Sequence, residues 1–96
     1  MNYYMLIYKL AENYLKDRGQ YRSEHLEMAK RATEIGELIL GGAMDDPADE
    51  AILIFRGETD KAAKAFAEND PYLKNGLIKE WKVRKWNAVI GSKFEG

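Results

Sequence analysis

Three short, nearly continuous apolar runs are the first pattern along this chain. They cover residues 3–10 (YYMLIYKL), 38–44 (LILGGAM) and 51–56 (AILIFR), and polar or glycine residues bound each of them. Runs of this length predict strands, and the first and third are apolar enough to be buried on both faces. In residues 77–86, by contrast, Trp81 and Val83 alternate with charged residues, which is typical of a strand with one face in water.

Two other segments carry the 3.6-residue period of an amphipathic helix. In residues 21–36 the acidic and basic residues share one face, and the other face carries His25, Met28, Ala29, Ala32, Ile35 and Gly36. In residues 59–69, Thr59 is the expected N-cap and Phe66 lies in an alanine-rich apolar stripe. Pro71 ends this second helix, because proline cannot continue the hydrogen-bond ladder. The polar stretch 11–20 is expected to be a loop or an irregular helical turn.

The resulting order is β-α-β-β-α-β, the ferredoxin-like arrangement of the α+β class. It predicts one four-stranded antiparallel sheet with both helices on one face. The 96 residues are interpreted as a single domain, with its core in residues 3–86 and a weakly specified tail in residues 87–96. The first and third strands should be central, because these two runs are apolar at almost every position.

Two helices on one face leave the other face of this sheet uncovered. The apolar residues of the first and third strands would form an open patch there. The favoured prediction is a homodimer packed sheet against sheet through that face. The alternative is that the C-terminal tail folds over it.

Composition excludes several classes of protein and site. The 15 basic and 16 acidic side chains are interspersed, which argues against a nucleic-acid or anionic-membrane binder. The absence of cysteine excludes disulfides and a thiolate nucleophile, and a single histidine makes a metal site improbable. No apolar run approaches the ~20 residues that span a bilayer, and no signal peptide is recognised, so a cytoplasmic protein is expected.

The residues with most chemical promise are His25, the only histidine, and Asp70 in the motif Asn69-Asp70-Pro71-Tyr72. In this topology the start of the first helix, the hairpin from Met44 to Glu50 and the end of the second helix share one end of the domain. The element order therefore predicts that His25 and Asp70 are neighbours.

A carboxylate beside an imidazole favours the protonated ring and decides which nitrogen carries the proton. We therefore interpret His25 and Asp70 as a candidate acid–base dyad. Arg22, one turn away, can hold an anionic substrate group or simply pair with Asp70. Tyr72 and Met44 are further candidates for substrate contacts. The structural alternative is that Asp70 caps a helix that begins with Pro71.

These residues also support a family resemblance. Arg22-x-x-His25-Leu26, Gly36, Gly41-Gly42-Ala43, the run from Ala65 to Tyr72 and Gly76-Leu77 resemble the YCII-related family of small bacterial proteins, from about Tyr4 to Trp86. The resemblance implies a ferredoxin-like fold that pairs into a dimeric α+β barrel. It also implies that the histidine and aspartate form an acid–base site for lyase-type elimination on small, often cyclic molecules. The chain departs from many members at Ser23, where they carry proline, and in its short acidic hairpin.

Two main functions follow. In the first, the protein is a small cofactor-independent enzyme in which His25 transfers a proton and Asp70 orients it, while Arg22 and Tyr72 bind a small anionic or phenolic substrate. In the second, the protein is a non-catalytic dimeric module that binds a small metabolite or a partner protein. A cofactor-free monooxygenase of the same fold is less favoured by these motifs, and fold alone does not decide among the three.

Overall fold

The computed structural model describes residues 1–91 and 94–95, in which the predicted β-α-β-β-α-β order is present together with several further short elements. Its elements are β1 (Asn2–Leu10), α1 (Tyr14–Asp17), the 3₁₀ turn η1 (Arg18–Gln20), α2 (Arg22–Glu34), β2 (Leu38–Ala43), β3 (Glu50–Gly57), α3 (Lys61–Asn69), α4 (Pro71–Lys74), β4 (Ile78–Trp86), β5 (Ile90–Gly91) and β6 (Phe94–Glu95). The four long strands form one antiparallel sheet in the order β2-β3-β1-β4. The ferredoxin-like prediction is confirmed, with the first and third strands at the centre.

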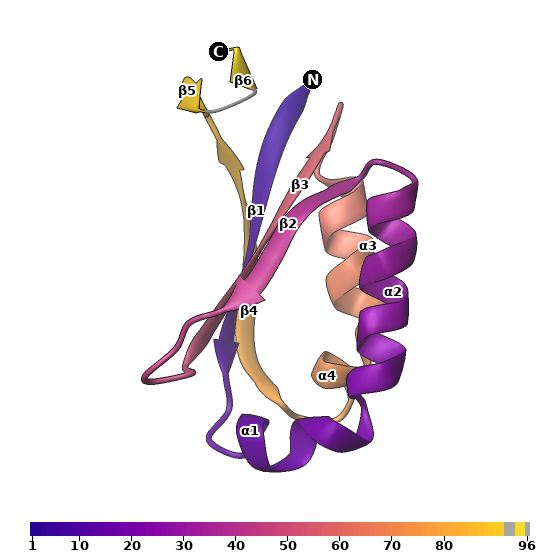
Figure 1. Ribbon diagram of the computed structural model, residues 1–96, viewed down its shortest axis with the longest axis vertical. Helices are drawn as coiled ribbons and strands as arrows, with labels where there is room; N and C mark the ends of the chain where they lie inside the picture. The colour runs from indigo at the N-terminus through magenta and orange to yellow at the C-terminus, as the bar shows by residue number, and fades with distance from the viewer. Residues whose placement is uncertain (92–93, 96) are drawn as a thin grey trace.

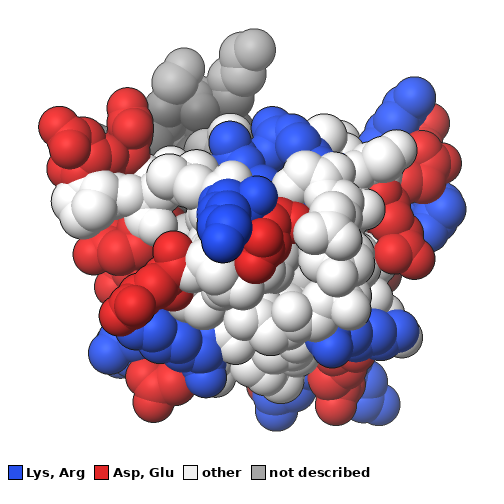
Figure 2. Space-filling view, turned by 90° about the horizontal axis from the view of Figure 1, so that it is seen from below, with Lys and Arg blue, Asp and Glu red and all other residues white. Residues whose placement is uncertain are grey.

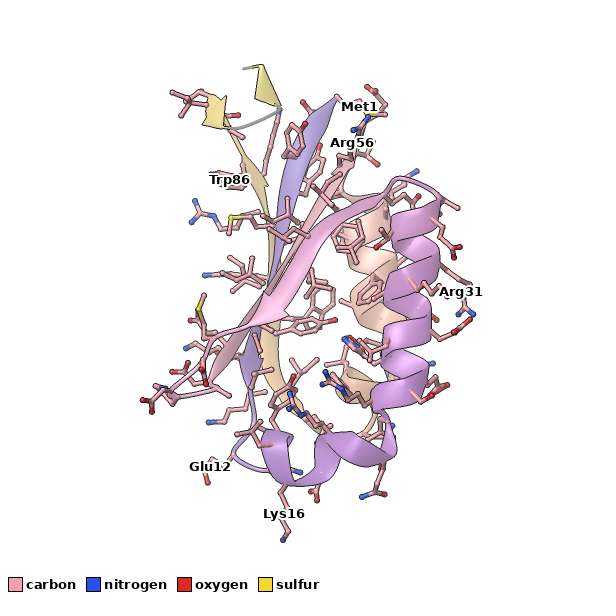
Figure 3. The ribbon with its side chains drawn as sticks, viewed as in Figure 1. Met1, Glu12, Lys16, Arg31, Arg56 and Trp86 are labelled. Carbon is pink, nitrogen blue, oxygen red and sulfur yellow. The ribbon has the colours of Figure 1, made fainter. Side chains whose placement is uncertain are left out.

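Helices α2 and α3 lie together on one face of this sheet (Figure 1). Side chains alternate along β1, so every second residue points toward the helices. In β1 the buried residues are Tyr4, Leu6, Tyr8 and Leu10, and they meet Phe55 from β3 and Phe66 from α3 in the hydrophobic core. Figure 3 shows side chains filling the layer between the sheet and the helices, while labelled charged residues such as Arg31 and Lys16 point away from it.

The other face of the sheet has no helix over it. The intervening residues of β1 and β3 lie there and are only partly buried. Met5 pairs with Ile54, and Ile7 pairs with Ile52, so apolar residues face each other across the two central strands. Within the single chain, the continuous apolar runs of these strands are therefore buried on the helix side alone.

The described part of the tail does not cover this face. β5 pairs with β6 in a separate two-stranded sheet, and neither strand joins the main one. Figure 1 shows the pair beyond the end of β4, near the N-terminus. Val89 and Ile90 are 72% and 88% exposed. Residues 92–93 and 96 of the predicted tail lie outside the described residues.

The helix boundaries differ slightly from those predicted. Helix α2 ends at Glu34, because Gly36 adopts a left-handed backbone (φ 82°) that ends the helix. Ile35 therefore turns outward and is 70% exposed, although the periodicity placed it on the buried face. Helix α3 begins one residue later than expected, with Asp60 at the N-cap position. The Thr59 hydroxyl still accepts a hydrogen bond from the Lys61 amide at 3.3 Å.

The polar stretch 11–20 forms α1 and η1, which close the lower end of the molecule in Figure 1. Seen from this end, acidic and basic side chains are intermingled over the surface (Figure 2). This mixture agrees with the interspersed charges of the sequence. Among the described residues, no helix has the length and apolar character needed to cross a membrane.

The left-handed turn at Gly36 generates a stability prediction. A Cβ at Gly36 would meet no heavy atom within 4 Å, so Gly36→Ala changes only the backbone preference. We expect this variant to lower the free energy of unfolding by about 1 kcal/mol, measured by urea denaturation. Gly19→Ala is the matched control, because Gly19 also has open space around it but no positive φ. Equal stability of the two variants would contradict the expectation.

Candidate active site

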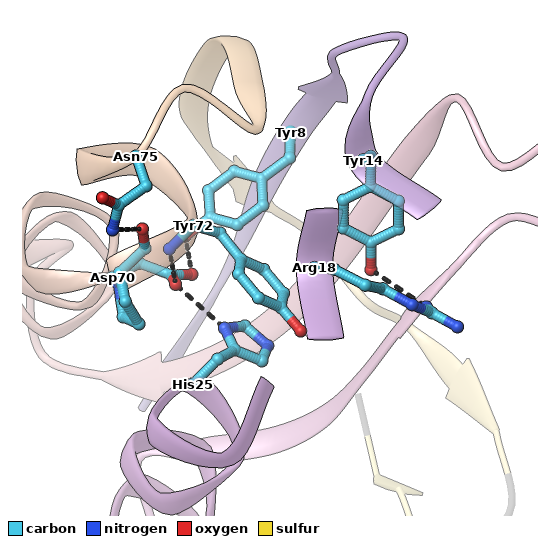
Figure 4. A network of polar contacts seen from close by, with 8 residues as sticks. Tyr8, Tyr14, Arg18, His25, Asp70, Tyr72 and Asn75 are labelled. Atoms are coloured by element: carbon cyan, nitrogen blue, oxygen red, sulfur yellow. Dashed lines mark hydrogen bonds and ion pairs between the residues drawn. The ribbon is translucent and has the colours of Figure 1, made fainter. Parts of the chain in front are cut away.

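The predicted neighbours are in contact. His25 lies in the first turns of α2, and Asp70 lies at the junction of α3 and α4. His25 Nδ1 is 2.9 Å from Asp70 Oδ1 (Figure 4). The side chain of His25 is 15% exposed and that of Asp70 is fully buried, so the imidazole separates the carboxylate from solvent.

Asp70 accepts two further hydrogen bonds. The Tyr8 hydroxyl donates to Oδ2 at 2.8 Å, and the backbone N–H of Tyr72 donates to Oδ1 at 2.9 Å. The second bond is an N-cap, with Pro71 at the first position of α4. The capping role and the contact with His25 thus coexist in one side chain, so the predicted cap and the predicted proximity of the two residues are both observed.

The carboxylate decides the orientation of the imidazole. An ionised carboxylate has no proton to give, so the Nδ1–H of His25 is the donor in their bond. In the neutral ring the proton therefore sits on Nδ1, and Nε2 keeps a free lone pair. Nε2 is the nitrogen left to exchange a proton with a ligand.

Tyr8 is a permanent donor to this carboxylate. Burial raises the pKa of the Tyr8 hydroxyl far above its usual value, and the charge of Asp70 and their hydrogen bond raise it further. The hydroxyl consequently stays protonated throughout the ordinary pH range. This keeps Oδ2 of Asp70 supplied with a hydrogen bond, as a buried carboxylate requires.

Tyr72 completes the site. Its ring stacks on the His25 imidazole, with 4.0 Å between centroids and 11° between planes. Its hydroxyl is buried and has no hydrogen-bond partner within the described part of the chain. Burial raises the pKa of the Tyr72 hydroxyl, and the nearby Arg22 guanidinium opposes this rise through its charge and its interaction with the hydroxyl. The hydroxyl therefore keeps its proton and has it available.

These groups line a cavity of about 460 Å³ between α1, the start of α2 and the inner face of the sheet. This volume is within the range of small-molecule sites. Gly41 lines the cavity without a side chain, and a Cβ there would lie only 3.2 Å from the Leu53 side chain. The lining residues are Tyr8, Leu10, Tyr14, Arg18, Arg22, His25, Leu26, Ala29, Lys30, Thr33, Leu38, Leu40, Gly41, Gly42, Ala43, Ala51, Leu53 and Tyr72.

Most of the predicted site residues meet here. His25, Arg22 and Tyr72 line the cavity, and Asp70 lies directly behind His25. Among the described residues Arg22 forms no ion pair with Asp70, so that alternative is not observed. Met44 is outside the lining, whereas Ala43 is part of it. Met44 follows the last residue of β2, whereas the lining from this segment comes from the strand itself.

Among the lining residues that sequence reasoning missed, Tyr8, Tyr14 and Arg18 matter most for the chemistry of the cavity. Tyr8 lies in the first apolar run, but a buried tyrosine needs a partner for its hydroxyl. Its place near the end of the first strand, at the end of the domain shared by His25 and Asp70, was the available signal. Tyr14 and Arg18 had no such signal, because they belong to the stretch expected to be irregular. Within the described residues, no group of three or more His, Asp or Glu side chains is positioned to hold a metal ion.

The bond from Tyr8 to Asp70 generates a second prediction. Tyr8→Phe leaves Oδ2 of a buried carboxylate without its donor, so we expect a loss of roughly 1.5–3 kcal/mol in unfolding free energy at pH 7. Because the pKa of Tyr8 is raised in the folded state, the wild type loses stability above pH ~10, where the unfolded tyrosine ionises. Tyr8→Phe lacks this loss, so the difference in unfolding free energy between the wild type and the variant should become smaller above that pH.

Urea denaturation at several pH values measures this difference, and Tyr4→Phe is the matched control. Tyr4 lies on the same face of β1, but its hydroxyl contacts no carboxylate: it donates to the Glu58 carbonyl at 3.4 Å and accepts from the Asn2 side-chain amide at 3.3 Å. A constant difference between wild type and Tyr8→Phe from pH 7 to pH 11 would contradict the proposed linkage.

Comparison with solved structures supports the fold. A chain of 5-chloro-2-hydroxyhydroquinone dehydrochlorinase from Burkholderia phenoliruptrix, in complex with 2,5-dihydroxybenzoquinone, aligns with a TM-score of 0.73 and 22% identity, covering 88% of this chain and 93% of that one. The protein Atu4242 from Agrobacterium tumefaciens aligns with a TM-score of 0.59 and 18% identity, covering 91% and 92%. A NIPSNAP family protein from the same organism aligns with a TM-score of 0.55 and 16% identity, covering 98% and 95%. At these identities the likeness concerns the fold.

A search of curated proteins finds no significant match to this sequence. The family comparison is positive, since residues 1–87 match the YCII-related domain. This span includes His25, Asp70 and all four strands of the main sheet. The chain therefore belongs to the YCII-related family.

Proposed function

We propose that this protein is a small enzyme that performs acid–base chemistry, by elimination or isomerisation, on a small anionic or phenolic molecule. The observation that carries the proposal is the 2.9 Å contact between His25 Nδ1 and the buried carboxylate of Asp70, in the wall of a cavity of ligand size. The chemistry needs only the side chains of the chain itself.

In the proposed reaction Nε2 of His25 accepts a proton from the substrate. In an elimination the leaving group departs with the electron pair of its bond while the substrate forms a new double bond, so no oxidant or reductant is needed. The imidazolium that forms is stabilised by the Asp70 carboxylate, which holds it on the opposite side of the ring. Returning the proton to another substrate atom would instead complete an isomerisation.

The structural neighbour in complex with 2,5-dihydroxybenzoquinone supports the choice of substrate class. That protein is a dehydrochlorinase acting on a hydroxylated ring, and the present chain shares its fold. The three tyrosines of the cavity suit a planar ring, which can stack on them or meet their edges. We therefore place hydroxylated rings with a leaving group first among the compounds to be assayed.

Activity of dyad variants tests the proposal. With any turned-over compound from such a panel, we expect His25→Ala to lower kcat/KM by about 10²–10⁴-fold, because positioned proton transfer contributes on this scale. Glu24→Gln is the control, since Glu24 is exposed beside His25 on the same helix. Unchanged turnover in folded His25→Ala would refute the acid–base role. Binding without consumption of any compound would favour the non-catalytic module.

The role of Asp70 can be separated from folding by NMR. In the wild type, ¹⁵N shifts of the neutral His25 ring should report the Nδ1–H tautomer. In Asp70→Asn the amide oxygen can still accept from the Tyr72 N–H and from Nδ1–H, so the tautomer and the fold should be kept, but the negative charge that stabilises the imidazolium is lost and turnover should fall. Wild-type turnover in a folded Asp70→Asn with the same tautomer would show that Asp70 acts only as the cap of α4.

We also propose that the protein works as a homodimer joined through the uncovered face of the sheet. The pairs Met5–Ile54 and Ile7–Ile52 form the apolar centre of this face. Lys9, Glu80 and other charges of both signs lie around it, and Lys9 and Glu80 approach within 3.5 Å. A face that carries both signs can match a second copy of itself about a twofold axis.

Sedimentation equilibrium measures the proposed association. We expect Ile54→Lys to shift the protein toward monomer, because the new charge would be buried without a partner at the interface. Ile35→Lys is the control, since Ile35 is 70% exposed at the end of α2 and away from this face. A monomeric wild type, or a dimer indifferent to Ile54→Lys, would contradict the interface.

A further inference from the structure

We propose that Arg18, Arg22 and the Tyr72 hydroxyl form a carboxylate-binding subsite at the mouth of the cavity. The ligand of the site is accordingly a single-ring aromatic carboxylate. This inference deepens the proposed function, since it names a ligand class for the same cavity. It does not depend on turnover, because it concerns binding alone.

The charge of the cavity lining is the first observation. Arg18, Arg22 and Lys30 line it, and none of the lining residues is an aspartate or glutamate in the part of the chain described. The whole chain has a net charge of -1, so this local excess of positive charge is not a general property of the protein. Such a cavity attracts an anion and repels a cation.

The arginines of the cavity are also not neutralised by neighbours. On the outer face of α2, Arg31 pairs with Glu27 at 3.7 Å. Within the described residues, neither Arg18 nor Arg22 forms an ion pair of this kind. Their guanidinium groups therefore remain available to a ligand.

The Tyr72 hydroxyl is the second, independent observation. Tyr72 is 2% exposed, and its hydroxyl has no hydrogen-bond partner within the described residues. A buried hydroxyl without a partner is costly, and a ligand oxygen in the cavity would supply the missing acceptor. Arg18, Arg22 and Tyr72 all line this one cavity, and the charges of both guanidinium groups act on the Tyr72 hydroxyl.

The geometry around Arg18 favours a carboxylate on a ring. Its guanidinium lies 5.3 Å from the centroid of the Tyr14 ring, and the Tyr14 hydroxyl is 3.5 Å from its terminal nitrogen. Tyr14 in turn packs edge-on against Tyr72 at 5.7 Å. A guanidinium held in this way presents its fork of N–H donors, which matches the two oxygens of a carboxylate. The apolar and aromatic residues that line the rest of the cavity suit the ring of such a ligand.

Calorimetry with a charged and a neutral probe of the same shape tests the subsite. We expect 4-hydroxybenzoate to bind the protein at least about tenfold more tightly than 4-hydroxybenzamide, since a hydrogen bond to a charged group contributes more than a neutral one. Arg18→Gln, Arg22→Gln and Tyr72→Phe should each weaken benzoate binding several-fold and leave benzamide binding nearly unchanged. Arg31→Gln is the matched control and should change neither affinity.

The outcomes distinguish this inference from the proposed enzyme. Preference for 4-hydroxybenzoate that persists in His25→Ala supports the subsite even if no compound is ever turned over. Equal affinity for the two probes, no binding of either, or a preference that survives all three subsite variants would overturn the inference. Those last results would leave the dyad and its activity tests untouched.

Discussion

The side chain of Asp70 lies fully buried where α3 passes into α4, and three donors from separate parts of the chain meet its two oxygens. Tyr8 links Asp70 to the central strand β1, His25 links it to the start of α2, and the Tyr72 amide links it to α4. A buried carboxylate is tolerated only when its oxygens are satisfied in this way. The lower end of the domain is therefore organised around one charge, and the position and tautomer of the imidazole follow from it.

The same constraint shapes the cavity. Because Asp70 is bonded to Nδ1 of His25, the imidazole is held in the wall of the cavity. Tyr72, two residues after Asp70, stacks on this ring. Capping α4 thus sets the orientation of both aromatic rings. The Tyr72 hydroxyl has no hydrogen-bond partner in the described chain, and it shares the cavity with the guanidinium groups of Arg18 and Arg22. Stability and the proposed ligand recognition involve the same few side chains, so substitutions at Asp70 are expected to change both.

The two faces of the sheet have different structural roles. The helix-facing residues of β1 form the core and supply Tyr8 to the site, whereas the alternate residues form the uncovered apolar face. This separation results from the two-residue period of a strand. It allows the face used for the proposed association to vary without altering the carboxylate or its donors.

Local patterns in the sequence were sufficient for the fold and for the dyad. Apolar runs and helical periodicity identified the elements, and their order alone placed His25 beside Asp70, because antiparallel crossings bring distant segments to one end of a sheet. These local patterns were insufficient where a contact depends on the position of an individual side chain. Ile35 turned outward because Gly36 ends the helix in a left-handed conformation, and Met44 fell outside the cavity because it lies just beyond the end of β2. Tyr8, Tyr14 and Arg18 joined the site only through packing, since a hydroxyl or guanidinium finds its partner across tertiary distances that no local spacing records. The sequence by itself thus determined the elements, their order and the pair at their shared end, and the tertiary structure decided which donors surround that pair.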